Sequence, residues 1–269
     1  MLAFALRMLR DKYKLFIVYA VASVGFLEMY IAIFPAIQKQ SVQLEKLLNT
    51  MPSTLFKAMN MDPSVLSFRT LEQYLSSDYL SFLWPILAIV FAVSIANYIL
   101  VTEIDKGTIE TLASLPSTRN KIFIERYFTG LVMLALFSVI SLFGAIPLAK
   151  LHNITYSLNH YVTATIGAFF FIWAVYSLAT LFSVIFSEKG KATMTTGGVL
   201  IVMYVLNAIA ALNNNIKDFK YFSFFHYFVG TDLLAKNIYP QYALLVLGGF
   251  AIIVSIVALV WVNRRDLSV

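Results

Sequence analysis

The chain has 269 residues, of which 60% are hydrophobic and only 13% are charged, and its mean hydropathy is +0.79. A soluble domain of this size carries far more charge, whereas a protein that crosses a bilayer several times must be poor in charge. Cysteine is absent, which excludes disulfides and thiolate metal sites. The net charge of +6 lies at the ends of the apolar segments, so it predicts contact with anionic lipid and not with nucleic acid.

Six apolar segments are long enough to cross a hydrocarbon core of ~30 Å as helices. They are residues 15–35, 82–101, 128–149, 162–186, 195–212 and 242–262. Lys and Arg are concentrated in 1–14, 103–126, 187–191 and 264–265, so the positive-inside rule places both termini in the cytoplasm. The predicted fold is an all-α polytopic membrane protein with a single transmembrane domain over residues 1–269.

The segments outside the spans are also predicted to be partly helical. Basic and apolar residues alternate in 1–14, which favours a helix lying in the membrane interface. A signal peptide is the alternative, but apolar sequence continues well past its possible cleavage site. The outer loop 38–80 has apolar periodicity typical of three short surface helices, around Leu44, Leu55 and Leu71. The aromatic run 221–228 is too short to cross and too apolar for water, so it predicts a re-entrant segment before the last span.

The most informative stretch is the polar segment 103–119 between the second and third spans. Gly107 is predicted to break the preceding helix because glycine adopts positive φ freely, and Thr108 is a good N-cap. Glu110 suits the positive end of a helix dipole, and Pro116 ends the helix, after which Ser117 can cap the next one. One face of this helix is formed by Ile109, Leu112, Ala113 and Pro116. We therefore expect a short amphipathic helix fixed between two spans.

This segment resembles a known family through the ordered residues Glu103, Gly107-Thr108, Leu112 and Leu115-Pro116-Ser117-Thr118-Arg119. They are similar to the signature of type-two ABC exporter permeases, and Arg264-Arg265-Asp266-Leu267 is similar to the usual C-terminal tail of that family. The middle of the chain matches only in its pattern of spans. In the family this segment is a coupling helix that docks on a separate ATP-hydrolysing subunit.

The resemblance implies how the protein is assembled. It implies two permease copies, as a homodimer or a paralogous heterodimer, with two ATP-binding subunits that carry ATP and Mg. It also implies export by alternating access across a bacterial plasma membrane, and an abundance of Phe, Tyr and Met best fits an amphipathic or hydrophobic substrate such as a peptide, toxin, drug or lipid. The residues expected to couple to the ATPase are Glu103, Gly107, Thr108, Ile109, Glu110, Leu112, Pro116 and Arg119.

The chain itself has no recognisable catalytic or nucleotide-binding motif. Gly190-Lys191 lacks the upstream glycine of a phosphate loop, since residue 185 is Ile, and Ala192 stands where Ser or Thr is required. The histidines have no metal-ligand spacing. We therefore expect no enzyme activity and no bound cofactor or metal in this chain, with ATP hydrolysis supplied by the partner.

Glu28 is the one charge that we place inside a predicted span. An ionised acid there costs on the order of 3 kcal/mol, so it should face the bundle interior or water. It either belongs to a substrate path or gate, or it is a hydrogen-bonded packing residue. The other candidates for a path or gate are Asn97, Asn207, Phe225 and His226.

Other classes of protein remain as alternatives. A channel or ion-coupled carrier that needs no ATPase usually has several intramembrane charges or broken helices in paired positions. A single Glu28 and the absence of an internal repeat argue against it. A membrane scaffold or intramembrane enzyme is a further alternative, but the sequence shows no catalytic set for the latter.

Overall fold

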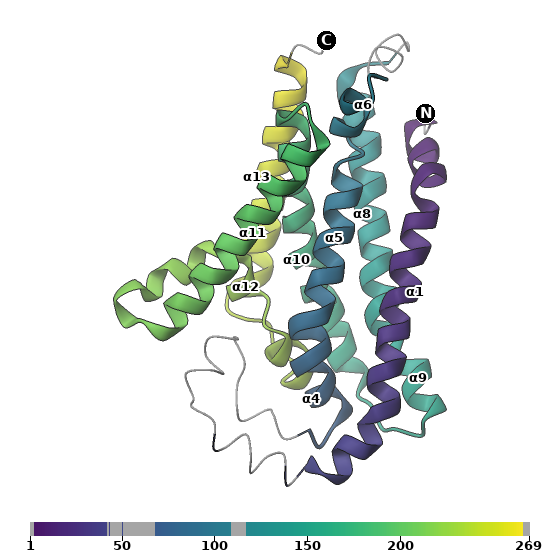
Figure 1. The fold of residues 1–269 in the computed structure, drawn as a ribbon, viewed down its shortest axis with the longest axis vertical. Coiled ribbons are helices and arrows are strands. Elements are labelled where there is room, and N and C mark those ends of the chain that lie inside the picture. Colours follow the sequence, from purple (N-terminus) through teal and green to yellow (C-terminus); the bar gives the residue numbers. More distant parts are fainter. Residues whose placement is uncertain (1–2, 42, 44–49, 51–67, 109–116, 266–269) are drawn as a thin grey trace.

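The structure is a computed structural model that describes residues 3–41, 43, 50, 68–108 and 117–265. Every regular element in these residues is a helix. Figure 1 shows an elongated bundle in which helix α1 begins and helix α13 ends at the same end, here called the terminal end. The opposite end, which contains α4 and α9, is called the loop end.

The elements are α1 (Ala3–Lys39), α4 (Leu71–Leu75), η2 (Ser76–Leu83), α5 (Trp84–Ala96), α6 (Val101–Asp105), α8 (Arg119–Phe143), α9 (Ala145–Leu151), α10 (Leu158–Ile185), α11 (Lys189–Leu212), η3 (Asn214–Phe222), α12 (Phe224–Tyr227), η4 (Thr231–Ala235) and α13 (Ala243–Arg264).

Six helical runs in the described residues are long and apolar enough to cross a membrane. Four of them are the single helices α1, α10, α11 and α13. The other two are continuous runs of shorter elements, Leu71–Ala96 and Arg119–Leu151. The prediction of an all-α polytopic membrane protein with six transmembrane helices is therefore confirmed.

Helix α10 is the centre of the bundle. It packs against α5, α8, α11 and α13, and 67% of its most apolar stretch is buried, against 22% for α1 and for α11. Small residues such as Ala164, Gly167 and Ala168 allow the neighbouring helices to approach it closely. The outer helices present their remaining apolar side chains to the surroundings, as expected of a protein surrounded by lipid.

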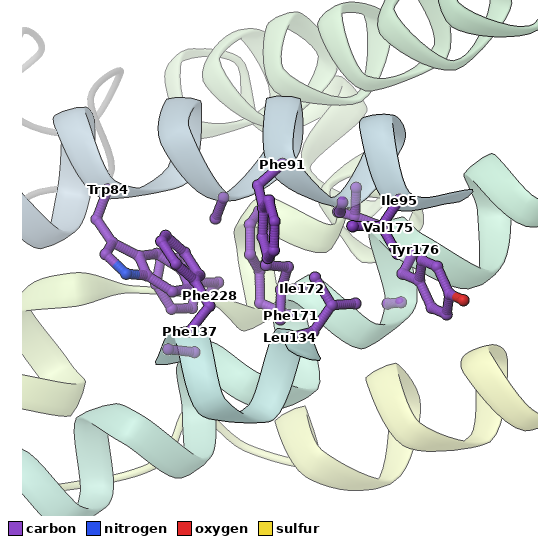
Figure 2. Packing of buried hydrophobic residues seen from close by; sticks show 14 of the residues in the cluster. Trp84, Phe91, Ile95, Leu134, Phe137, Phe171, Ile172, Val175, Tyr176 and Phe228 are labelled. Carbon is purple, nitrogen blue, oxygen red and sulfur yellow. The ribbon is translucent and has the colours of Figure 1, made fainter. Parts of the chain in front are cut away.

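The core between α5, α8 and α10 is largely aromatic (Figure 2). The ring centroids of Phe91 and Phe137 lie 5.0 Å apart, and Phe171 stacks on Phe228 at 4.5 Å. Trp84 is fully buried, and its indole N–H donates to the Ser141 hydroxyl at 2.7 Å. The Trp84–Ser141 hydrogen bond joins the second span to α8, so it restricts the rotation of these helices as well as their separation.

The structure corrects the prediction of a separate interfacial helix at 1–14. From Ala3 onward this segment is the start of α1, which continues without interruption to Lys39. No Gly or Pro lies between the basic N-terminal residues and the apolar segment. The predicted interfacial helix therefore has no helix-ending residue before the first span begins, and the two form one helix. Pro35 lies inside α1, near its end.

The second span begins earlier than the predicted residue 82. Residues Leu71–Leu75, expected as a surface helix of the 38–80 loop, form α4, and η2 then joins α4 directly to α5. Thr70 caps this run through a capping box with Gln73, and Leu71, Tyr74 and Leu75 are buried. The wide π-type turn of η2 directly precedes Pro85, whose ring excludes a regular turn before it. The predicted surface helices around Leu44 and Leu55 lie outside the described residues.

The third and fifth spans also begin before their predicted starts, at Arg119 and Lys189 instead of 128 and 195. Hydropathy marks where a helix leaves the apolar layer, whereas the helix itself ends where its backbone is capped. Thr118, and not the predicted Ser117, is the N-cap of α8: its hydroxyl accepts from the Lys121 N–H at 3.4 Å. The fourth and sixth spans lie close to their predicted bounds.

The segment between the fifth and sixth spans folds back on the bundle. It contains η3, α12 and η4, and α12 contacts α11, α13 and α10. Phe224, Tyr227 and Phe228 are buried, so the aromatic run 221–228 packs partly on protein. A re-entrant position in the membrane stays a prediction, but the short helices expected there are present.

Helix α8 approaches its neighbours closely at Gly130. A Cβ at this position would lie 2.2 Å from the Tyr176 hydroxyl oxygen and 2.9 Å from Ile95 Cγ2, and Tyr176 is fully buried. We expect Gly130→Ala to lower the free energy of unfolding in mixed micelles by about 1–3 kcal/mol, because the helices must move apart.

Gly249→Ala is the matched control, because a Cβ on this helical glycine of α13 meets nothing within 4 Å. Its unfolding free energy should stay close to that of the wild type. Equal stability of the two variants would contradict the close packing of α8 on α5 and α10.

Candidate functional site

The candidate site lies at the terminal end, where the second span is interrupted. Helix α5 ends at Ala96, and the chain makes a turn through residues 97–100 before α6 begins at Val101. The Thr102 N–H reaches back to the Asn97 carbonyl at 3.0 Å, one residue further than in an α-helix. The turn therefore leaves the carbonyls of Tyr98 and Ile99 without their usual helical donors.

Arg126 supplies the missing donors. Its Nη1 donates to the Tyr98 and Ile99 carbonyl oxygens, each at 3.0 Å, and its guanidinium carbon lies 4.9 Å from the centre of the Tyr98 ring. Arg126 comes from the second turn of α8 and is fully buried. A buried guanidinium is stable only when charge and hydrogen bonds compensate it, so these contacts fix α8 against the break in the second span.

Glu103 compensates the charge of Arg126. Its Oε1 accepts from Arg126 Nη2 at 2.9 Å, and only 7% of the residue is exposed. The other carboxylate oxygen accepts from the Thr108 hydroxyl. Burial raises the pKa of Glu103, but the Thr108 hydrogen bond and the charge of Arg126 outweigh it, so the pKa lies below its ordinary value. The carboxyl group is therefore ionised at neutral pH and bound within the chain.

The turn at Gly107 leads directly from this ion pair to the predicted amphipathic helix. Gly107 has φ +67°, and the Thr108 N–H donates to the Glu103 carbonyl at 2.9 Å. The predicted break at Gly107 is thus confirmed, for the conformational reason given by the sequence. Ile109, Glu110, Leu112 and Pro116 lie outside the described residues, so the helix itself and its apolar face stay predictions.

The far end of the segment is attached as well. Arg119 Nη1 donates to the Arg265 carbonyl at 2.6 Å, and Arg265 in turn binds the C-terminus of α10. Its Nη1 donates to the carbonyls of Val184 and Phe186, at 2.6 and 3.0 Å, and its Nη2 donates to the Ser187 hydroxyl at 2.6 Å. A cation at a helix C-terminus satisfies carbonyls that have no helical partner. Both ends of segment 109–116 are therefore anchored to the bundle.

Helix α6 and helix α1 are part of the same junction. The Val101 N–H donates to the Ser183 hydroxyl of α10 at 3.3 Å, and the Lys189 N–H at the start of α11 donates to Asp105 at 3.4 Å. The Tyr98 hydroxyl donates to Asp11 of α1. The spans α1, α8, α10 and α11 thus each contact the short stretch between Ala96 and Thr108 through at least one polar bond.

The predicted path residues are not brought together. Glu28 binds the His152 Nε2 at 2.8 Å, between α1 and α9 at the loop end. The Asn97 Nδ2 donates to Thr193 of α11 at 2.8 Å, whereas Asn207 is buried further along α11. His226 packs against the rings of Tyr221 and Tyr227 in the short helical segment, where burial and Lys220 lower its pKa.

The path candidate Phe225 lines a groove. This groove, of ≈ 380 Å³, lies between the η2–α5 run and α11. Its lining is apolar except for the hydroxyl groups of Ser81 and Tyr204, and it consists of Ser81, Phe82, Pro85, Ile86, Ile89, Gly197, Leu200, Ile201, Tyr204 and Phe225. Figure 1 shows α11 diverging from α5 toward the loop end, and the groove lies along this divergence.

Sequence reasoning missed the central role of Arg126. Its position in segment 103–126, where Lys and Arg are concentrated, indicates only one of several bases at the end of a span. Its neighbours along the chain, Ile122, Phe123 and Tyr127, are buried, which is unusual for a boundary. A base within an apolar run needs a nearby acid, and Glu103 at the start of the preceding polar segment was one of the available partners.

The fold and this junction define a multi-span membrane protein in which the residues on either side of segment 109–116 are bound to the bundle. Comparison with known families agrees with this class: the family described as ABC-2 family transporter protein matches residues 6–267. The chain therefore belongs to the ABC-2 transporter family and is a transmembrane permease of ABC transport. No curated protein and no solved structure matches it.

The buried pair predicts an unequal response to substitution. Arg126→Met should lower the free energy of unfolding by about 3–5 kcal/mol, because it leaves the Glu103 charge and two carbonyls buried without donors. Glu103→Gln keeps one acceptor for the guanidinium and should cost about 1–3 kcal/mol. Both changes in the free energy of unfolding are measured by denaturing the variants and the wild type in mixed micelles.

Lys121→Met serves as the matched control, since Lys121 is an exposed base in the first turn of the same helix. Its effect should stay within about 0.5 kcal/mol. If Arg126→Met were no more destabilising than Lys121→Met, the guanidinium would not be what holds the junction together.

Proposed function

We propose that this permease forms the membrane part of an ATP-driven exporter, with two permease copies and two separate ATP-binding subunits. The observation that carries the proposal is the junction around Arg126, which anchors segment 109–116 at both ends. A segment can transmit force only if its ends are fixed, and here they are fixed by buried or helix-capping contacts. Glu103, Gly107, Thr108 and Arg119 would position the segment, while Ile109, Glu110 and Leu112 would contact the ATPase.

The contacts of the junction suggest how movement would pass into the bundle. Displacement of segment 109–116 would act on Thr108 and Glu103, and through the ion pair on Arg126 in α8. The break at residues 97–100 separates α6 from α5, so α6 can tilt without bending a continuous helix. Rigid-body rocking of the two permease copies would follow, in the manner of alternating access.

The terminal end is proposed to face the cytoplasm, where the ATP-binding subunits would dock. The Lys and Arg residues of segments 103–126, 187–191 and 264–265 all gather at this end, as the positive-inside rule requires. The loop end, with the Glu28–His152 pair, would face outward. The plasma membrane of a bacterial cell is the proposed location.

The groove between α5 and α11 supports a hydrophobic or amphipathic substrate. Its volume of ≈ 380 Å³ lies within the range of small-molecule sites, and its lining from Phe82 to Phe225 offers almost no hydrogen bonds. A peptide with apolar side chains, a drug or a lipid fits this chemistry. Glu28 lies against α1 and α9, and the groove does not include it, so we propose an ion-pairing role for Glu28 instead of a gate.

Membrane orientation is testable because the chain contains no cysteine. A single cysteine at the exposed position Thr155, near the loop end, should react with an impermeant thiol reagent in intact cells. Cysteines at the exposed positions Lys121 and Lys189, at the terminal end, should react only after the cells are opened. The reverse pattern would refute the proposed orientation.

Coupling to the ATPase is tested in the predicted amphipathic helix. Leu112→Ala combined with Glu110→Lys should give a normally inserted permease that no longer co-purifies with its ATP-binding subunit. Loss of a buried interface anchor costs on the order of 1–3 kcal/mol, and the added lysine opposes the helix dipole. The measurements are pull-down yield and ATP hydrolysis in reconstituted vesicles.

Leu151→Ala is the control, because Leu151 is 71% exposed and lies at the other end of the bundle. It should leave pull-down and hydrolysis unchanged. Normal pull-down and normal hydrolysis of the Leu112→Ala/Glu110→Lys variant would mean that the segment is not the contact with an ATPase.

A further inference from the structure

An apolar groove with a cationic end runs along the outer face of α13. It has a volume of ≈ 490 Å³ and is lined by Ile256, Val257, Val260, Trp261, Arg264 and Arg265. Ile256 and Arg264 are eight positions apart, or about 12 Å along the helix, which is close to the depth of one hydrocarbon leaflet. The groove therefore has the length and polarity of one end of a lipid molecule.

The apolar lining is accessible from outside the bundle. Ile256 is 55% exposed, Val260 44% and Trp261 46%, whereas Val262, on the opposite face of α13, is buried. An exposed Trp near the end of a span is typical of the interface between hydrocarbon and headgroups. The groove consequently spans from the hydrocarbon region to the headgroup level.

The two arginines at the polar end differ in their contacts. Arg265 is bound to the carbonyls of Val184 and Phe186, so its guanidinium is held in place as part of the protein. The Arg264 side chain is exposed, and within residues 68–108 and 117–265 it makes no hydrogen bond or ion pair. Arg265 is thus a fixed part of the groove wall, whereas the guanidinium N–H groups of Arg264 are available to bind an anion.

We propose that this groove binds an anionic phospholipid, with an acyl chain along Ile256, Val260 and Trp261 and the phosphate on Arg264. The positive end of the groove is complementary to the charge of such a headgroup, and the apolar part to its chain. Since the Arg265 carbonyl accepts from Arg119, a lipid bound here would lie next to the end of segment 109–116. The proposal does not depend on the direction of transport or on the ATPase.

The test uses quenching of Trp261 fluorescence by brominated lipids in symmetric vesicles. The chain has three tryptophans, of which Trp84 is buried and Trp173 is partly buried. The contribution of Trp261 is the difference between the wild type and Trp261→Phe. We expect brominated phosphatidylglycerol, as a minor component in phosphatidylcholine, to quench Trp261 with about fivefold preference over brominated phosphatidylcholine at the same mole fraction.

Arg264→Gln should remove this preference and leave non-selective quenching. Arg10→Gln, which removes an exposed base of α1 at the same end, should leave the preference intact. Equal quenching by both lipids in the wild type would mean that Trp261 contacts only the non-selective lipid that surrounds the protein, and it would overturn the proposal. It is also overturned if the preference survives Arg264→Gln, or if neither lipid quenches Trp261 because protein covers the groove.

Discussion

The terminal end of this permease depends on one constraint, the burial of the Arg126 guanidinium. A buried charge must be compensated by an opposite charge and by hydrogen bonds, because its desolvation costs several kcal/mol. Glu103 provides the charge, and the carbonyls freed by the break at residues 97–100 provide the acceptors. The break, the ion pair and the turn at Gly107 are therefore not independent features, since each one makes the others stable.

The same arrangement explains why the two ends of the bundle differ. At the terminal end α1, α5, α8, α10 and α11 are all connected through polar bonds to the stretch 97–108, and Arg265 closes the C-terminus of α10. Toward the loop end α11 diverges from α5, and the space between them is an apolar groove. The polar connections at the terminal end and the divergence of α11 toward the loop end support the proposal of a transporter that rocks about its centre.

The sequence predicted the six spans and the turn at Gly107 because both depend on local properties, the hydropathy of about 20 residues and the φ preference of one. It did not predict helix ends such as Ala3 or Lys189, which depend on caps and on the absence of a break. It also missed the pairing of Glu103 with Arg126, since hydropathy treats a charge near a span end as a boundary marker. That pairing joins residues from two helices, and only the fold shows that both are buried.

The most direct measurement is the distance distribution between nitroxide labels at Lys106 and Lys121, exposed positions on either side of segment 109–116. If the Arg126–Glu103 pair fixes the ends of the segment, the wild type should show one narrow distance, and Arg126→Gln or Glu103→Gln should broaden it. Glu28→Gln, at the other end of the bundle, should leave it unchanged. An equally narrow distribution in all of these proteins would contradict the central role of the buried pair.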